Sequence, residues 1–396
     1  MFRLAFAIAI VFSAGCGGAN KPPGETPKQA TGKQASGEAP GSTGTEPAKG
    51  TTGAAPNMAA TVTPAPQAAG TGPAKETESP PAKAANPQEM FASGAKLEQL
   101  WNEGEFTEGA ACGPDGAIYF SDIPDAAIGR IFRFDPDSKK VVVHCADSRK
   151  SNGLCFTKDG RLLAACGANE GGRAVCEIVA GGTAIPLVSE FSGKLLNAPN
   201  DLDVDAAGNI YFSDPFYVGK EPLDLDHMSV YYVDADTMKP KRITTDITKP
   251  NGVALAPDGK RLYVAETNNG QPALATADPQ YAAWRMTLNA FPILGPGELG
   301  ERQILVDFGK GAGIDGMTCD AAGNIYAALR NEKRFGIAVF SPSGEELAFL
   351  PTPELPTNCC FGSQRSDEES HRLYVTAGKG LYCIATREAG PAWYAK

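Results

Sequence analysis

The stretch EGAACGPDGAIYFSD, residues 108–122, contains the pattern that decides the fold. It begins with a polar residue, continues through a short apolar run and a turn containing glycine, and ends in a run of aromatic and β-branched residues. The same order of features returns in NDLDVDAAGNIYFSD, residues 200–214, and in four other places. The chain therefore contains an internal repeat, and this repeat determines the fold class more than any single motif does.

In five copies the polar residue lies eight positions before the glycine of the turn. These pairs are Glu108 and Gly116, Asn152 and Gly160, Asn200 and Gly208, Asn251 and Gly259, and Asp315 and Gly323. A sixth copy begins at Asn358 and carries extra residues, SQRSDEES, in its turn region. Units of about 50 residues made of short strand-like runs are typical of four-stranded propeller blades. The sequence therefore predicts an all-β fold, a six-bladed β-propeller with four antiparallel strands in each blade.

The last repeat lacks its outermost strand, because only a tail with Pro and Gly follows GLYCIA. The segment KLEQLWNEG, residues 96–104, stands before the first repeat and matches the outer strands of the other units. We expect this N-terminal strand to complete the last blade, which closes the ring without leaving exposed sheet edges.

Two segments precede the propeller, for which we expect the range 93–396. Residues 1–16 have one early Arg, an apolar run and the ending SAGC, the layout of a bacterial secretory signal with a lipobox-like end. Ser13 replaces the usual Leu of a lipobox, which leaves cleavage by signal peptidase I open. Residues 17–92 are rich in Ala, Pro, Gly and Thr and are expected to form a disordered tether.

These segments predict an exported protein of the bacterial cell envelope. We expect a lipoprotein, either periplasmic or on the outer surface, that contacts the membrane only through a lipid anchor at Cys16. The alternative is a secreted protein. The formal charge of -10 argues against a nucleic-acid partner, because phosphate binding requires clustered Lys and Arg. We expect a monomer.

Several classes of active site lack support in the sequence. No G-x-S-x-G motif occurs, which argues against a serine hydrolase with a nucleophile elbow. The chain has only 3 His, and C-x₂-C pairs of the zinc type are absent. Nine Cys remain besides Cys16. We expect most of them to be buried thiols in the strands, with a disulfide between Cys166 and Cys176 as an alternative.

The six polar residues define a candidate site. Each begins the innermost strand of its unit at the same register, so the six side chains should converge on the central channel. These residues are Glu108, Asn152, Asn200, Asn251, Asp315 and Asn358. Carboxylate and amide oxygens suit Ca²⁺, with Mg²⁺ or Mn²⁺ as second choices and Zn²⁺ as a poor one. The alternative is that Asn or Asp only starts a turn, but a turn requirement does not explain Glu108.

The motifs Glu108-Gly-Ala, Asn200-Asp201, Asn251-Gly252 and Asp315-Gly316-Met317, with YFSDI and YFSDP at strand ends, resemble a known family. The resemblance is to the regucalcin/gluconolactonase family of calcium-dependent six-bladed propellers, over nearly all of residues 95–385. More distant likeness extends to the paraoxonases and to the phosphotriesterases similar to diisopropyl-fluorophosphatase.

The resemblance implies a role for each residue of the ring. Glu108, Asn251 and Asp315 match metal ligands of the family. Asn200 matches a residue that binds substrate in the sugar lactonases and metal in the phosphotriesterases. Asn152 and Asn358 are assigned to substrate binding, although the position of Asn152 varies among these families. Ala198 replaces an Arg of the regucalcin-like sugar lactonases, which weakens the prediction of a sugar-acid lactone more than that of the metal.

The function predicted from the sequence is metal-assisted hydrolysis of a lactone or related ester. The metal would polarise the carbonyl, and Asp315 or Glu108 would accept a proton from water, with Asp315 favoured. Two alternatives stay open: a non-catalytic propeller that presents a binding face in the cell envelope, and a phosphotriesterase that uses the same metal site. Loop residues Phe216, Tyr217, His227 and Tyr281 are candidates for weaker contacts with the substrate.

Overall fold

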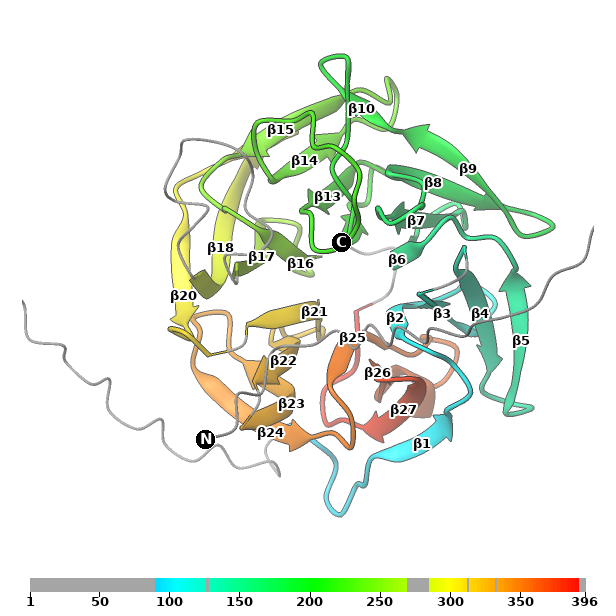
Figure 1. Ribbon diagram of the computed structural model, residues 1–396. Helices are drawn as coiled ribbons and strands as arrows, with labels where there is room; N and C mark the ends of the chain where they lie inside the picture. The colour runs from blue at the N-terminus through cyan, green and yellow to red at the C-terminus, as the bar shows by residue number, and fades with distance from the viewer. Residues whose placement is uncertain (1–89, 126–127, 269–284, 312, 332, 392–396) are drawn as a thin grey trace, which may run out of the picture. The chain divides into compact units, whose positions relative to one another are not determined.

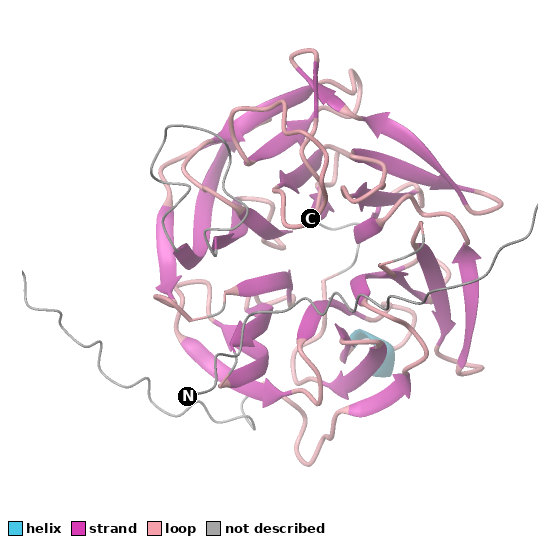
Figure 2. Ribbon diagram, in the orientation of Figure 1, coloured by secondary structure: helices cyan, strands magenta, loops and turns pink. Residues whose placement is uncertain are grey.

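The computed structural model describes residues 90–391, except 126–127, 269–284, 312 and 332. The expected signal, nearly all of the expected tether and Tyr281 lie outside the described residues. The described part is almost entirely β-structure, and its strands are arranged as blades around a central axis (Figures 1 and 2). The six-bladed propeller predicted from the repeat is confirmed.

Each blade is an antiparallel sheet, and in blades 1 to 5 the strands follow one another outward from the axis in chain order. Blade 1 contains β2 (Thr107–Cys112), β3 (Ile118–Asp122), β4 (Arg130–Asp135) and β5 (Lys140–Cys145). Blade 2 contains β6 (Ser151–Phe156), β7 (Leu162–Cys166), β8 (Ala174–Val179) and β9 (Thr183–Val188). Blade 3 contains β12 (Leu202–Val204), β13 (Ile210–Asp214), β14 (Ser229–Val233) and β15 (Pro240–Thr244).

Blades 4 and 5 follow the same order, whereas blade 6 takes its outer strand from the segment before blade 1. Blade 4 contains β16 (Pro250–Leu255), β17 (Arg261–Asn268), β18 (Arg285–Gly295) and β20 (Gln303–Asp307), and the short β19 (Glu298–Leu299) also pairs with β18. Blade 5 contains β21 (Ile314–Cys319), β22 (Ile325–Asn331), β23 (Arg334–Phe340) and β24 (Glu346–Pro351). Blade 6 contains β25 (Pro356–Phe361), β26 (Arg372–Ala377), β27 (Gly380–Ala385) and β1 (Glu98–Trp101).

The N-terminal strand closes the ring as the sequence predicts. β1 pairs antiparallel with β27, and Glu98 lies opposite Cys383. A single bridge between Phe91 and Thr386 extends this closure toward the start of the described chain. The first and last parts of the propeller are thus held in one sheet, and the last blade has its fourth strand.

Two small elements lie outside the blade pattern. A hairpin of β10 (Glu190–Phe191) and β11 (Lys194–Leu195) follows blade 2. The one-turn helix α1 (Asp367–Ser370) occupies the insertion in the sixth repeat, where the Ser366 side chain caps it by accepting from the Glu369 backbone N–H. No helix in the described residues is long and apolar enough to span a bilayer.

The inner strands approach one another closely around the axis, and glycine makes this approach possible. A Cβ on Gly109 would lie 1.9 Å from the carbonyl oxygen of Asn152, and one on Gly252 would lie 2.3 Å from that of Asp315. Both glycines directly follow a residue of the polar ring. The backbone of one blade therefore packs against the ring residue of the next, where no side chain fits.

β-Bulges interrupt the inner strands at the polar ring. The pairing with the second strand shifts between Glu108 and Ala110 in β2, and similar shifts occur at the ring position of β6, β16, β21 and β25. A bulge turns a side chain away from the regular alternation of a strand and often lies beside a binding site. Here the register shift lies at or next to the ring residue in five blades.

The cysteines expected in the strands are buried thiols. All nine lie in the described residues, where eight are buried and Cys155 is partly exposed. Cys166 and Cys176, the pair considered for a disulfide, lie on neighbouring strands β7 and β8 and share a hydrogen bond between their side chains. They are two residues out of register, since Cys176 lies opposite Ala164.

Candidate functional site

The structure places the six predicted ring residues at or next to the start of the inner strands. Glu108, Asn152, Asn251 and Asp315 are second in their strands, Asn358 is third in β25, and Asn200 stands two residues before β12. Glu108, Asn251, Asp315 and Asn358 are buried, whereas Asn152 and Asn200 are half-buried. Neighbouring inner strands also contact through their backbones, since the Gly153 N–H donates to the Asn200 carbonyl at 2.8 Å.

Glu108 and Asp315 form the acidic part of the site. Burial raises the pKa of Glu108 well above its usual value, and the nearby charge of Asp315 raises it further. Burial likewise raises the pKa of Asp315, while Arg330 and a hydrogen bond with Asn251 act in the opposite direction. Two neighbouring buried carboxyl groups repel each other when both are ionised. A positive charge beside them would remove this repulsion, so the site favours a cation as a partner.

Arg330 is that partner within the protein, and sequence analysis missed it. Its Nη1 lies 2.5 Å from Oδ2 of Asp315, and its guanidinium stacks over the ring of Phe106 at 5.8 Å from the centroid. It stands directly after Leu329, and Leu329 occupies the position where blades 1 and 3 have the Asp of YFSD. An Arg one residue after a missing acid is the sequence signal that could have identified it.

Tyr217 joins the site from the loop between β13 and β14. Its hydroxyl donates to the Thr267 carbonyl at 3.2 Å, and it shares a hydrogen bond with the Asn251 side chain. The ammonium of Lys249, which is buried, lies 4.7 Å from the centre of the Tyr217 ring. Burial lowers the pKa of Lys249 to about 8. This side of the channel therefore combines an amide, a phenol and two cations, Lys249 and Arg330.

A buried acid at the end of the second strand holds the segment before the ring in three blades. Asp122 accepts from the N–H groups of Glu105 and Phe106 at 2.8 and 3.0 Å. Asp214 accepts from Asn197 and Ala198 at 2.9 and 2.8 Å, and Glu266 accepts from Thr248 at 2.8 Å. In each of the three blades, one donating N–H belongs to the residue three positions before the ring residue. These donors are Glu105, Asn197 and Thr248. The repeated strand-end acid is therefore an anchor for the residue that enters the channel.

The other loop candidates have mainly packing roles. Phe216 is buried in a small cluster with Ala198 and Met228. His227 is buried, and its Nδ1 lies 2.8 Å from the Ser229 hydroxyl. Ala198, at the position where regucalcin-like lactonases have Arg, thus belongs to an apolar contact instead.

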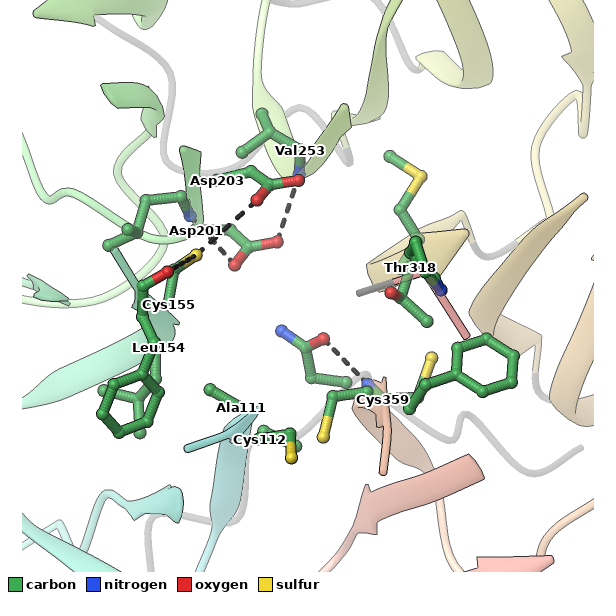
Figure 3. A pocket seen from close by; sticks show the side chains of 17 residues that line it. Ala111, Cys112, Leu154, Cys155, Asp201, Asp203, Val253, Thr318 and Cys359 are labelled. Atoms are coloured by element: carbon green, nitrogen blue, oxygen red, sulfur yellow. Dashed lines mark hydrogen bonds between the residues drawn. The ribbon is translucent and has the colours of Figure 1, made fainter. Parts of the chain in front are cut away.

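The channel continues below the ring as a cavity of about 90 Å³ that residues from all six inner strands line. Asp201 and Asp203 reach across one side of it toward blade 4 (Figure 3), where they accept from the N–H groups of Val253 at 3.1 Å and Leu255 at 2.9 Å. Burial raises the pKa of Asp201 to about 7. These two carboxyl groups satisfy N–H groups that the inner edge of β16 would otherwise leave unpaired, so we assign them a structural role.

The anchor Asp214 gives stability a pH dependence. Burial raises its pKa to about 7, although two backbone N–H groups lower it. An unfolded Asp titrates near 3.9, so the folded state keeps a proton that the unfolded state has lost between about pH 4 and pH 7. Protonated Asp214 therefore stabilises the folded state fully below about pH 4. This stabilisation decreases as the pH rises from about 4 to 7, by at most about 1.4 kcal/mol per pH unit, and is lost above about pH 7.

The substitution Asp214→Asn removes this titration. We expect the difference in unfolding free energy between the native chain and the variant to be largest near pH 4 and to shrink toward pH 7. Urea unfolding at a series of pH values measures it, and a difference that stays constant over this range would contradict the assignment.

Comparison with known proteins gives consistent matches. The model of the SMP-30/Gluconolactonase/LRE-like region matches residues 101–379. A gluconolactonase of Zymomonas mobilis is 27% identical over 67% of this chain and 72% of its own length. A pentonolactonase of Haloferax volcanii is 27% identical over 69% of this chain and 81% of its own.

Solved structures match over the propeller. A gluconolactonase of Xanthomonas campestris has a TM-score of 0.62 at 27% identity and covers 78% of this chain and 98% of its own. A calcium-binding regucalcin of Agrobacterium tumefaciens has a TM-score of 0.58 at 20% identity and covers 75% of this chain and 97% of its own. At 20% identity, the likeness to the regucalcin shows a common fold and nothing further.

Proposed function

Because the chain belongs to the SMP-30/Gluconolactonase/LRE-like family, it is a hydrolase of lactones, and we propose that it is a calcium-dependent sugar lactonase. The observation that carries this proposal is the buried pair of Glu108 and Asp315 beside Asn251 in the channel. A non-catalytic binding face would gain nothing from two carboxyl groups that disfavour each other's ionisation.

The donor set of the ring fits a hard divalent cation. Glu108, Asn251 and Asp315 offer carboxylate and amide oxygens, with Asn200 as a further amide next to them in the ring. Ca²⁺ accepts such mixed oxygen ligands more readily than Mg²⁺ or Zn²⁺.

Different residues of the site would have different roles in hydrolysis. A bound cation would polarise the lactone carbonyl and stabilise the negative charge that develops on its oxygen. Asp315 would take the proton from the attacking water, because Arg330 and Asn251 favour its ionised form. Glu108 would keep the cation in place. Asn200, Asn152 and Asn358 would contact the hydroxyl groups of the substrate from the other blades.

We also propose that the protein resides in the bacterial cell envelope. The signal-like residues 1–16 with Cys16, followed by a tether rich in Pro and Gly, support this location. A lipid anchor at Cys16 would hold the propeller at the membrane surface, where it would meet lactones outside the cytoplasm.

Removal of the metal tests the proposal. The full chain, freed of metal by a chelator, should lose hydrolysis of D-glucono-δ-lactone to the uncatalysed rate, and Ca²⁺ should restore it better than Mg²⁺ does. The same assay should include acyl lactones and phosphotriesters. Activity that persists in the chelator would contradict the metal dependence. A calcium-loaded protein that cleaves only phosphotriesters would contradict the lactonase assignment.

A further inference from the structure

The side of the channel formed by blades 4 and 5 carries positive charge directly beside the acidic pair. Within the described residues, the Arg330 guanidinium donates one hydrogen bond, to Asp315. Its side chain is 28% exposed, whereas that of Asp315 is 10% exposed. A guanidinium has five N–H groups in a planar fork, so most of them remain available to a ligand in the channel.

The position of Arg330 is fixed by its surroundings. Its backbone N–H donates to the carbonyl of Gly313, two residues before Asp315, at 3.0 Å. Its guanidinium lies over the ring of Phe106, two residues before Glu108. The cation is thus held between blade 5 and blade 1 at the level of the two acids. A flat guanidinium held in this way is well suited to bind a carboxylate with two parallel hydrogen bonds.

The charge balance of the site indicates what Arg330 binds. If the proposed divalent cation is present, it balances the charges of Glu108 and Asp315. The charge of Arg330 is then left without a counter-charge of its own in a partly buried place. An uncompensated buried cation is costly, and an anionic group on the substrate would remove that cost.

We infer that Arg330 anchors a negatively charged substituent of the substrate, so the preferred substrates are lactones that carry a second, ionised acid group. This inference rests on the proposed lactonase function. Lactones of sugar diacids have this chemistry, since ring closure uses one acid group and leaves the other as a free carboxylate. The lactone carbonyl would face the acid ring while the free carboxylate meets the guanidinium.

The test compares two substrates with the same ring. The γ-lactone of D-glucaric acid has a carboxylate where the γ-lactone of D-gluconic acid has a hydroxymethyl group. At a fixed calcium concentration, we expect the native chain to have a kcat/KM for the charged lactone about ten- to a hundredfold higher than for the neutral one. In Arg330→Gln this preference should disappear, mainly through a higher KM, and Arg330→Lys should retain part of it.

Arg334→Gln is the matched control. Arg334 lies in the next strand of the same blade, pairs with Glu346 and stacks over Phe349 at 3.9 Å, but it lies outside the channel. It should leave the preference unchanged. Calorimetric titration with D-glucarate and D-gluconate gives a readout independent of turnover, and Arg330→Gln should weaken the binding of glucarate alone.

The outcomes separate this inference from the function on which it rests. If the native chain hydrolyses both lactones equally, or if Arg330→Gln slows both by the same factor, the anchoring role is wrong and the lactonase proposal stands. If the native chain hydrolyses neither lactone, nor any neutral lactone, with calcium present, the proposed function itself fails.

Discussion

Replacement of Asp315 by Asn should reduce kcat/KM for lactone hydrolysis by at least about a hundredfold. The variant loses the proposed base and one of the two charges that would hold the cation, so metal affinity should also fall. The fold should persist, because Asn has the same shape and its carbonyl can still accept from Arg330. Kinetic assays with saturating calcium and a calorimetric calcium titration measure the two effects.

A surface variant and a second ring variant complete this test. Asp307→Asn changes an exposed acid at the end of the outer strand β20 and should have native activity. Glu108→Gln should resemble Asp315→Asn in metal affinity. Full activity in either ring variant would show that the chemistry takes place elsewhere.

Loss of Glu266 should cost about 3 to 5 kcal/mol of unfolding free energy, the largest effect we expect on stability. Its carboxylate is fully buried and lies 2.6 Å from Nη2 of Arg302, and it accepts from Thr248 and from the Thr287 hydroxyl. Glu266→Ala leaves the Arg302 charge without its partner in a side chain that is only 13% exposed. Denaturant unfolding of the native chain and the variant measures the loss.

The comparison variant is Glu346→Ala, which breaks a similar Arg–Glu pair at the surface. Its partner Arg334 is 43% exposed, so solvent can compensate for the loss, and we expect at most about 1 kcal/mol. If the two variants are equally destabilised, burial does not control the energy of the Glu266 network.

The fold could be predicted from the sequence because its repeat is regular. A polar residue eight positions before a turn glycine places the start of every inner strand, and the unmatched strand at residues 96–104 predicts how the ring closes. The YFSD endings could be read only as a likeness to a family. The structure supplies their physical reason, since Asp122 and Asp214 anchor the backbone before the ring.

The ring positions of the site were predictable for the same reason, and the long loop of the third repeat indicated Tyr217 as a contact, whereas Arg330 and Lys249 were not predicted. Arg330, Lys249 and Tyr217 meet the ring through contacts between blades or from a long loop. Tyr217 belongs to blade 3 in sequence but contacts Asn251 of blade 4. No periodic pattern specifies such a contact, because it depends on how neighbouring blades are rotated. The small insertion helix α1 likewise follows from local capping at Ser366 rather than from the repeat.

In the proposed function, one divalent cation at the polar ring is responsible for lactone hydrolysis. The most direct measurement follows calcium binding and lactonase activity in the same metal-free preparation of the full chain as calcium is added. We predict that activity rises in proportion to the occupancy of a single site, and that both responses are lost in Asp315→Asn. Activity that is complete before calcium binds, or calcium binding that Asp315→Asn leaves unchanged, would contradict the claim.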